Sequence, residues 1–501
     1  TQFGPIGLQN YLYPFLTIVV PNVFFMSAIF LSLSLLFRNH FVNWLTMILL
    51  YAIYYASTQL GKNPDFNFTA ALLDPFGLRA INYSAIGLTS EQLNENAVSK
   101  SQVVLLNRML WSILGMGMLF LTFLRFHFGI RQMKTLNFFN AFKVRALSNP
   151  QSVNKEAPAV NISFSFLVGL KQFLFLIRHE WSMLFKSMFF KIIMLIGVVL
   201  LFVSSTAIGK IYDTNTYPIA YSVADVFLEA NNLFFFVLIT LFSGEMMWRE
   251  RNLNFHLVGD ALPVNNGLKF SSKIVALTAF IFVAHVFMVL LGIGIQYKEA
   301  YYNYELGVLV KIILGIGFVN KLFLIGLAFA VQATVNNRFT GYFILLAYYF
   351  FQSLIAPYLI ENQTFLFNSG PSMLYSDMNG FGYNVPVFML FKTYWLIFIL
   401  LVLFLSVLLL PQGVEIEFKN RFKFLKDIMR IKRIQYTVFS LATIFIGLGS
   451  FIFYNVSVLN EFETAAESEM KMVEYERNFA QYKDKIEPVV TDISLLADLY
   501  P

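Results

Sequence analysis

The chain has 501 residues, of which 57% are hydrophobic and only 13% are charged. A soluble globular chain has about 45–50% apolar and about 25% charged residues. There is no cysteine, and the net charge at pH 7 is +7. This composition excludes a soluble enzyme, a disordered chain and a disulfide scaffold, and it indicates an all-α polytopic membrane protein. Nucleic acid is a poor candidate partner, because the basic residues alternate with apolar segments.

Apolar segments long enough to cross a bilayer recur along the whole chain. A helix needs about 20 apolar residues to span the hydrocarbon core. The sequence predicts about ten transmembrane helices, at residues 11–37, 41–60, 103–124, 188–208, 223–243, 274–295, 307–333, 340–360, 387–410 and 434–454.

The connections between these helices alternate in basic content. The connection 125–187 holds nine Lys and Arg residues, 411–433 holds seven, and 361–386 holds none. Basic loops stay in the cytoplasm. The pattern therefore places 38–40, 125–187, 244–273, 334–339 and 411–433 in the cytoplasm. It places 1–10, 61–102, 209–222, 361–386 and 455–501 outside, with an extracytoplasmic C-terminus. Richness in Phe, Asn, Ile and Lys suits a bacterial inner membrane.

Residues 307–410 resemble residues 11–124, which indicates an internal repeat. The alignment pairs Asn22 with Asn320, and LDPFG (73–77) with SDMNGFG (376–382). A basic residue precedes a tryptophan by three positions in both copies, at Arg108/Trp111 and Lys392/Trp395. The repeat predicts one complete six-helix half, the last three helices of another half, and one extra span. Three more spans are expected upstream of Thr1.

This reading divides the chain into seven parts. They are a partial first half (1–127), a cytoplasmic linker (128–164), an interfacial elbow helix (165–187), a second six-span half (188–410), a basic cytoplasmic linker (411–433), an extra transmembrane helix (434–454), and an extracytoplasmic helix with the start of an outside domain (455–501).

The cytoplasmic loop 244–273 carries the strongest functional signal. FHLVGDALP predicts a short helix that ends at Gly259 and a turn at Pro263. Such a helix between charged flanks is suited to docking on a soluble partner. From the residues alone, an ordinary solvated loop is an equal alternative. The candidate residues are Glu245, Arg249, Glu250, Arg251, Asp260, Leu262, Pro263 and Lys273.

The pattern G-E-x-x-x-R-E-R (244–251), followed by D-A-L-P (260–263) and Lys273, resembles ABC transporter permeases of the type-2 exporter class. LDPFG with NRMLW (107–111) is similar to the large bacterial members in which two permease halves are fused. The resemblance implies that loop 244–273 is a coupling loop gripped by two cytoplasmic ABC ATPase subunits, which would hold ATP and Mg. The chain has no G-x-x-x-x-G-K-[ST] phosphate loop, so no cofactor is expected on it.

Segment 165–187 alternates apolar residues with Lys171, Arg178, Glu180 and Lys186. This pattern favours an amphipathic helix in the headgroup plane, although the start of a longer span is an alternative. The resembled family has such an elbow helix beside the ATPase.

A few polar residues fall inside the predicted spans. Asn320 and Lys321 lie mid-span, and the repeat adds Asn22. Such residues either line a translocation path or make helix–helix hydrogen bonds, and the sequence weighs the two equally. Asp225 and Glu229 are expected at a wet outer rim. His285 is expected to be a packing residue.

The C-terminal tail changes composition after Tyr454. Residues 458–485 predict a charged helix, and 488–501 predict a β-strand that would open an outside domain. In the fused permeases that the chain resembles, that domain is a zinc aminopeptidase of the gluzincin class. None of its catalytic residues is present, and no histidines stand at metal-ligand spacing.

Three functions remain open at this stage. The first is the permease of an ATP-driven exporter. The second is a membrane anchor or force-transmitting subunit that acts on an extracytoplasmic domain or partner. The third, a polytopic membrane enzyme, is least favoured because no catalytic motif stands out.

Overall fold

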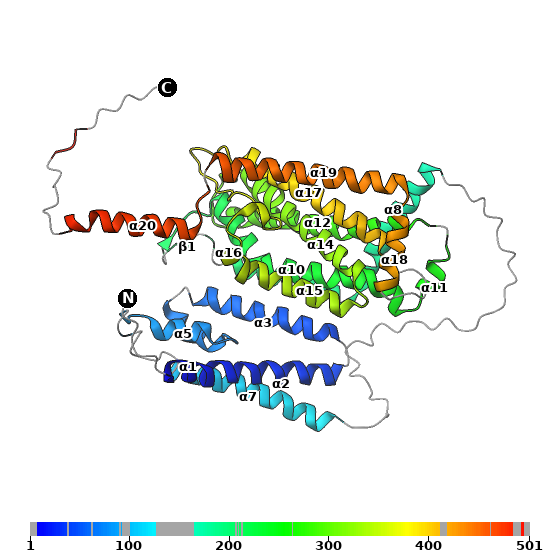
Figure 1. The fold of residues 1–501 in the computed structure, drawn as a ribbon. Coiled ribbons are helices and arrows are strands. Elements are labelled where there is room, and N and C mark those ends of the chain that lie inside the picture. The colour runs from blue at the N-terminus through cyan, green and yellow to red at the C-terminus, as the bar shows by residue number, and fades with distance from the viewer. Residues whose placement is uncertain are drawn as a thin grey trace. The chain divides into compact units, whose positions relative to one another are not determined.

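The computed structural model describes residues 8–37, 40–61, 64–89, 92, 101–126, 165–205, 208, 210–211, 214–262, 264–410, 418–460, 462–483 and 492–494. These residues are helical apart from turns and one short hairpin (Figure 1). Nine helices among them are long and apolar enough to cross a membrane, as expected of a multi-pass membrane protein. The predicted span 41–60 forms a helix of 21 residues, which is not among these nine.

The first part of the chain is built as follows: α1 (Gln9–Pro14), the π-helical η1 (Phe15–Val19), α2 (Val20–Phe37), α3 (His40–Leu60), η2 (Pro64–Phe66), α4 (Asn67–Leu73), α5 (Leu78–Ala85), α7 (Gln102–Arg125), α8 (Phe166–Lys186), α9 (Met188–Ser205), β1 (Lys210–Ile211) paired antiparallel with β2 (Thr214–Asn215), α10 (Ala220–Asn252), α11 (His256–Gly259) and α12 (Asn266–Lys298).

The second part follows: α13 (Leu306–Val310), η4 (Lys311–Phe318), α14 (Val319–Thr334), α15 (Arg338–Phe350), η5 (Phe351–Ile355), α16 (Ala356–Leu359), η6 (Gln363–Phe365), α17 (Asn384–Leu408), α18 (Phe418–Ile428), α19 (Lys432–Phe453), η7 (Tyr454–Leu459), α20 (Ala465–Phe479) and η8 (Ala480–Tyr482). Residues 1–345 and 402–430 form one compact unit, and 346–401 with 431–501 form another.

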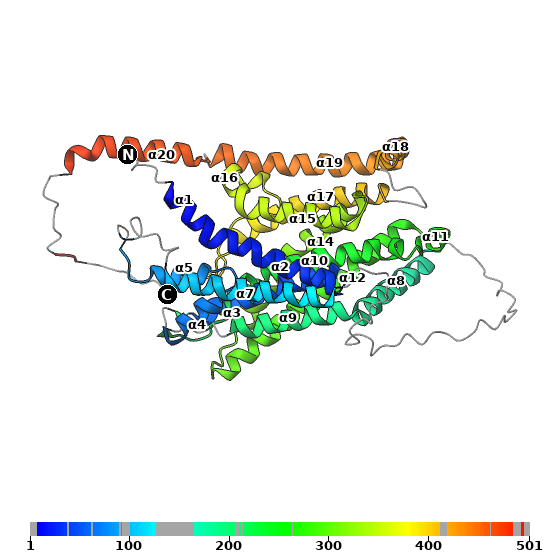
Figure 2. The same ribbon diagram turned by 90° about the horizontal axis from the view of Figure 1, so that it is seen from below.

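In the first unit, α2 and α7 pack side by side (Figures 1 and 2). Phe25 is fully buried against Trp111, with ring centroids 5.1 Å apart. A Cβ on Gly115 would lie only 3.3 Å from the Cβ of Ala28. Small residues at this crossing therefore allow the two backbones to approach closely, as is common between membrane helices.

Helix α7 also holds the loop that precedes it. Asn107 donates to the carbonyl of Asp74 at 2.9 Å, Arg108 to that of Pro75 at 3.2 Å, and Trp111 to that of Leu72 at 3.1 Å. Burying these backbone carbonyls is tolerable only because each has a donor. The motif LDPFG is therefore a structural turn pinned to α7.

The second unit has a comparable attachment. Lys392 of α17 donates to the carbonyl and side-chain oxygens of Asn368, at 2.7 and 2.9 Å. Trp395 packs against Phe367, with ring centroids 5.2 Å apart. The basic residue and the tryptophan thus hold a loop in each of the two segments that the sequence alignment pairs. The contacts match 73–77 with 367–368 rather than with 376–382, the segment that the sequence alignment paired with it.

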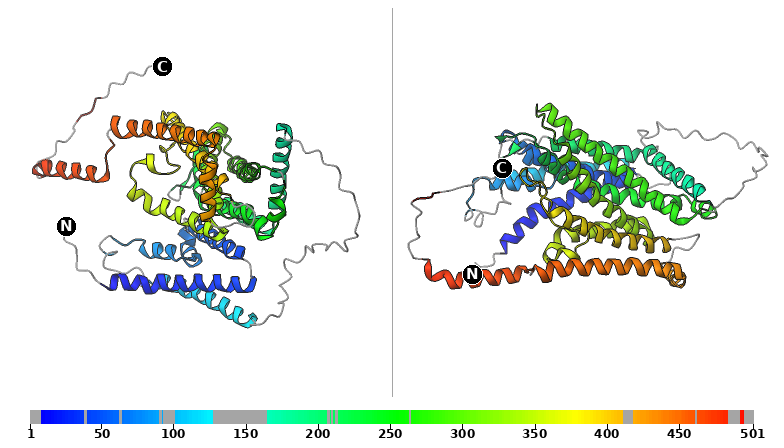
Figure 3. Two further views of the ribbon diagram at one scale, coloured as in Figure 1. Left: turned by 45° about the vertical axis from the view of Figure 1, so that its right-hand side comes forward. Right: turned by 90° about the horizontal axis from the view of Figure 1, so that it is seen from above.

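The elbow predicted at 165–187 is the helix α8. Ser165 caps it by accepting the N–H of Val168, and it ends at Lys186. Helix α8 packs against α12 and runs obliquely to α9, at the end of the bundle where α11 lies (Figures 2 and 3). Ser187, in an extended backbone conformation, separates it from α9.

Arg421 of α18 closes the C-terminal end of α14. It donates to the carbonyls of Ala333, Thr334 and Val335 at 3.0, 2.8 and 3.2 Å. The last carbonyls of a helix have no partner within the helix, so this guanidinium replaces water there. Burial, with a contribution from the charge of Arg251, lowers the pKa of Arg421.

The tail begins with a helix, as predicted. Helix α20 lies inside the expected 458–485, and Thr464 and Glu467 form a capping box at its start. Within the second unit, Glu361 accepts the N–H of Ala465 at 2.8 Å, and Asn362 donates to Ser457 at 2.8 Å. Of the predicted strand 488–501, only 492–494 are described. The linker 128–164 lies outside the described residues.

Candidate functional site

The predicted coupling loop is shorter than its sequence boundaries. Helix α10 continues through Asn252, and α12 begins at Asn266. Asn254 adopts a left-handed backbone conformation with φ of 56°, which reverses the chain. The N–H of Phe255 returns to the carbonyl of Glu250 at 2.8 Å. The short helix α11 follows and ends at Gly259, where the sequence predicted its end.

The tip of this loop exposes apolar side chains. Leu253 is 70% exposed and Val258 is 60% exposed; Phe255, Leu257 and Leu262 are also exposed. Contiguous exposed apolar residues on a short polar-flanked helix are typical of a protein-binding surface. We call residues 253–262 the docking tip. Pro263, the predicted turn residue, lies outside the described residues.

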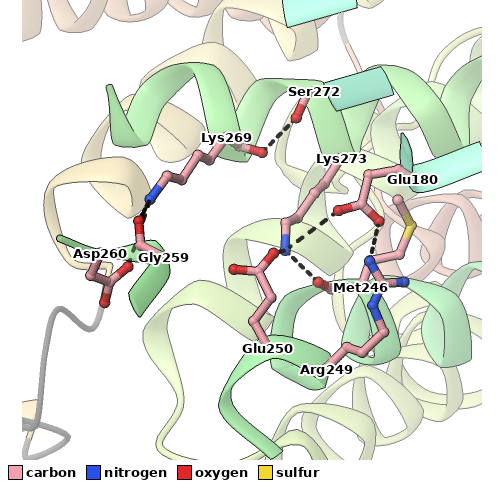
Figure 4. Close-up of polar contacts among 9 residues, drawn as sticks. All are labelled: Glu180, Met246, Arg249, Glu250, Gly259, Asp260, Lys269, Ser272 and Lys273. Carbon is pink, nitrogen blue, oxygen red and sulfur yellow. Dashed lines mark hydrogen bonds and ion pairs between the residues drawn. The ribbon is translucent and has the colours of Figure 1, made fainter. Parts of the chain in front are cut away.

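Behind the docking tip lies a buried cluster of charges, shown in Figure 4. Glu180 of α8 accepts a hydrogen bond from Arg249 of α10 at 2.8 Å. Lys273 of α12 lies 3.7 Å from Glu180 and 2.9 Å from Glu250, and it donates to the carbonyl of Met246 at 2.7 Å. These four charged residues, which we call the brace, join three helices.

The brace is electrically balanced, with two carboxylates and two cations. The side chains of Glu180, Lys273 and Arg249 are only 5%, 9% and 14% exposed. Charges removed from water to this degree are stable only when paired and hydrogen-bonded. Separating any of these partners would leave an uncompensated buried charge. The brace therefore holds α8, α10 and α12 in a defined position relative to one another.

A second set of contacts connects the docking tip to α12. Lys269 donates to the carbonyl of Gly259 at 2.6 Å, at the end of α11, and lies 3.8 Å from Asp260 (Figure 4). Asn265 caps α12 by accepting the N–H of Gly267 at 2.7 Å. A small crevice of about 80 Å³ runs between these residues and the brace. Lys269 therefore joins the end of α11 to α12.

The structure thus distributes the predicted coupling residues over several contacts. Arg249, Glu250 and Lys273 meet in the brace, and Asp260 lies beside Lys269. Glu245 forms a separate ion pair with Arg338 of α15 at 3.1 Å. Arg251 lines the crevice, and Leu262 is exposed.

Sequence reasoning missed the central role of Glu180. It was read as one of several headgroup-level charges on the elbow. Its signal was its position, four residues after Leu176 and four before the buried Leu184, which places it in the apolar stripe of α8. A charged residue within such a stripe requires a buried partner.

The polar residues of the spans have interhelical contacts. Lys321 of α14 donates to the side chain of Asn232 of α10 at 2.5 Å. Asp225, Glu229 and Asn232 are spaced along one face of α10, and all three are exposed. This face is a polar stripe that ends at Lys321, so the prediction of a path there stays open beside the hydrogen-bond alternative.

The remaining polar candidates have other surroundings. Asn22 donates to the carbonyl of Phe76 at 3.0 Å and also accepts a bond from Arg108, so it binds the loop 73–77. Asn320 is next to Lys321 on α14. His285 is fully buried and stacks on Phe235, with ring centroids 4.6 Å apart, as a packing residue would.

Two broader searches complete the description of the site. Within the described ranges, no three His, Cys, Asp or Glu side chains gather in a way that could hold a metal ion. Comparison with protein-family models, curated proteins and solved structures found no match to this chain.

Proposed function

We propose that this chain is the transmembrane permease subunit of an ATP-driven ABC exporter of the type-2 class in a bacterial inner membrane. Two soluble ATPase subunits, holding ATP and Mg, would bind the docking tip from the cytoplasm. The C-terminal tail would lie outside. ATP-driven closure of these subunits would move the helices joined by the brace and thereby move a substrate across or out of the membrane.

The observation that carries this proposal is the exposed docking tip supported by the buried brace. A loop that only connects two helices has no need of four paired charges, three of them largely buried, behind it. A loop that receives force must pass that force to the helices without bending. The contact of Lys269 with Gly259 and the contacts of Lys273 with Glu180 and Glu250 provide this stiffness.

The absence of cysteine from the sequence makes a clean test possible. Val258→Cys, on the docking tip, provides the only thiol within these 501 residues and can carry a photo-crosslinker in the native membrane. We expect it to capture a soluble subunit with ATPase activity. Met470→Cys, on the exposed face of α20, is the matched control and should capture none.

The docking contact itself can be tested by charge. Val258→Asp leaves the brace intact but places a carboxylate in the apolar tip. We expect it to abolish stimulation of the partner ATPase, whereas Tyr217→Asp, at a 74% exposed position before α10, should not. Unchanged stimulation with Val258→Asp would refute the coupling proposal.

The second candidate is an ABC-type membrane anchor that transmits force to an extracytoplasmic domain, such as an aminopeptidase, without moving a solute. The observation that favours it is the attachment of the tail. Glu361 and Asn362 bind Ala465 and Ser457, so the loop after α16 is connected to the start of α20. If reconstituted vesicles hydrolyse ATP but transport no solute, this candidate is favoured.

A further inference from the structure

A second cavity lies beside the docking tip, with a volume of about 520 Å³. It opens between the end of α10 with the chain reversal after it, and the turn that joins α14 to α15. We call it the notch. Its charged lining residues are Arg251, His256 and Arg338, and its polar lining includes Asn254. The notch is separate from the brace, since neither Glu180 nor Lys273 lines it.

The electrostatic balance of the notch is positive. Arg338 forms an ion pair with Glu245. Asp260 lies 3.8 Å from Lys269 and also interacts electrostatically with Arg251. Arg421 stands close enough to Arg251 for the two charges to repel. Among the residues that line this cavity, Arg251 and Arg338 are cationic and none is a carboxylate. Such a surplus attracts anions.

Two nitrogen atoms in the lining also have no hydrogen-bond partner. They are Nη2 of Arg251 and Nδ1 of His256, both buried, for which no acceptor is found in the part of the chain that the structure describes. Leaving such a group unpaired costs about 1–3 kcal/mol. The same two residues line the cavity, so an anionic oxygen bound there would provide an acceptor close to both.

The surroundings of the notch indicate which anion binds. It lies at the ends of three candidate spans, on the side that the loop charges assign to the cytoplasm. From the lining residue Phe339, exposed apolar side chains continue along α15 through Phe343, which is 71% exposed. A polar cavity at headgroup level beside an apolar track has the shape of a phospholipid.

We propose that the notch binds the phosphate headgroup of an anionic phospholipid of the cytoplasmic leaflet, with its acyl chains along α15. Arg251 and Arg338 provide the charge-assisted donors, and His256 and Asn254 complete the polar lining. This inference does not depend on the proposed function, because it requires no ATPase and no transported substrate.

The test uses the full chain purified in a neutral detergent, with dioleoylphosphatidylglycerol as the probe and native mass spectrometry to count bound lipid. We expect tighter binding of this lipid than of dioleoylphosphatidylcholine. Arg251→Gln should weaken binding about tenfold or more, since a charge-assisted hydrogen bond is lost. Arg430→Gln, an equal charge change at an 81% exposed side chain, is the matched control and should leave binding unchanged.

A second pair of variants guards against misfolding at Arg251. Asn254 has a left-handed φ that both aspartate and glycine accept, so Asn254→Asp and Asn254→Gly preserve the backbone. Only the aspartate adds a negative charge to the notch. It should weaken lipid binding about tenfold relative to glycine, as expected for like charges about 10 Å apart near a protein surface.

Three outcomes would overturn the proposal. They are equal binding of the two lipids, equal weakening by Arg430→Gln and Arg251→Gln, or equal binding by the two Asn254 variants. Displacement of the lipid by millimolar inorganic phosphate would instead identify a free-phosphate site and overturn the lipid assignment. Retention of the lipid in excess phosphate supports it.

Discussion

Replacing Glu180 with glutamine tests the brace, because the amide keeps the size of the side chain and removes its charge. The carboxylate lies 2.8 Å from Arg249, and at an effective dielectric near 20 that attraction is about 6 kcal/mol before desolvation. Removing one partner of a buried pair typically costs about 3–5 kcal/mol. We expect about 3 kcal/mol here, since Lys273 keeps Glu250 as a partner and Arg249 remains 14% exposed.

Hydrogen exchange of the amides of α8 measures this loss, because local opening of one helix is reported without unfolding the whole chain. A cost of about 3 kcal/mol corresponds to an increase in exchange of about a hundredfold. Arg178→Gln, an exposed position on the same helix, is the control and should have little effect. The double variant with Arg249→Gln should lose less than the sum of the two single variants, because no buried charge is stranded. Equal protection of α8 in the Glu180 and Arg178 variants would refute the brace.

Three further outcomes follow from the remaining contacts. Arg108→Gln should raise hydrogen exchange across 64–86, at a cost of about 2 kcal/mol, because buried carbonyls lose their donor; unchanged exchange there would contradict this. Arg421→Lys should lower the Tm as much as Arg421→Gln does, because a single ammonium group cannot reach the several carbonyls that the planar guanidinium binds at the end of α14. A Tm fully restored by lysine would contradict this role of Arg421. Hydrogen bonding from Thr464 lowers the pKa of Glu467, so the capping box is intact above the ordinary pKa of the carboxyl and is lost as the pH falls through its folded-state value. A spin label on α20 should therefore gain mobility in acid, and a Glu467→Gln variant with the same response would argue against this.

Features set by local sequence could be predicted well. Long apolar segments became helices because the bilayer requires internally satisfied backbone, and nine of them meet the criteria for a span within the described part of the chain. The end of α11 at Gly259 and the separation of α8 from α9 were also predicted, because glycine, proline and charge act within a few residues. The predicted span 41–60 also became a helix, although it is not among those nine.

Features set by distant contacts could not be predicted. Glu180 and Arg249 are 69 residues apart, and no local pattern specifies that they meet. The repeat aligned Asn22 with Asn320, yet Asn22 donates a hydrogen bond to the carbonyl of Phe76 in the loop 73–77. Similar sequences fix similar helices, but the partner of a polar side chain depends on which helix packs beside it.

The two proposed functions predict different effects when the brace is loosened. Because Lys273 and Arg249 both contact Glu180, α8, α10 and α12 are expected to move together when the docking tip is pulled. In an exporter, loosening the brace with Glu180→Gln should preserve ATPase binding while uncoupling transport, since force on α11 would bend the loop instead of moving the helices. In an anchor, the same variant should leave ATP hydrolysis intact and reduce only the displacement of the tail, which a distance measurement from α20 would detect. Solute flux and tail displacement are therefore the pair of readouts that distinguishes the two functions in one variant.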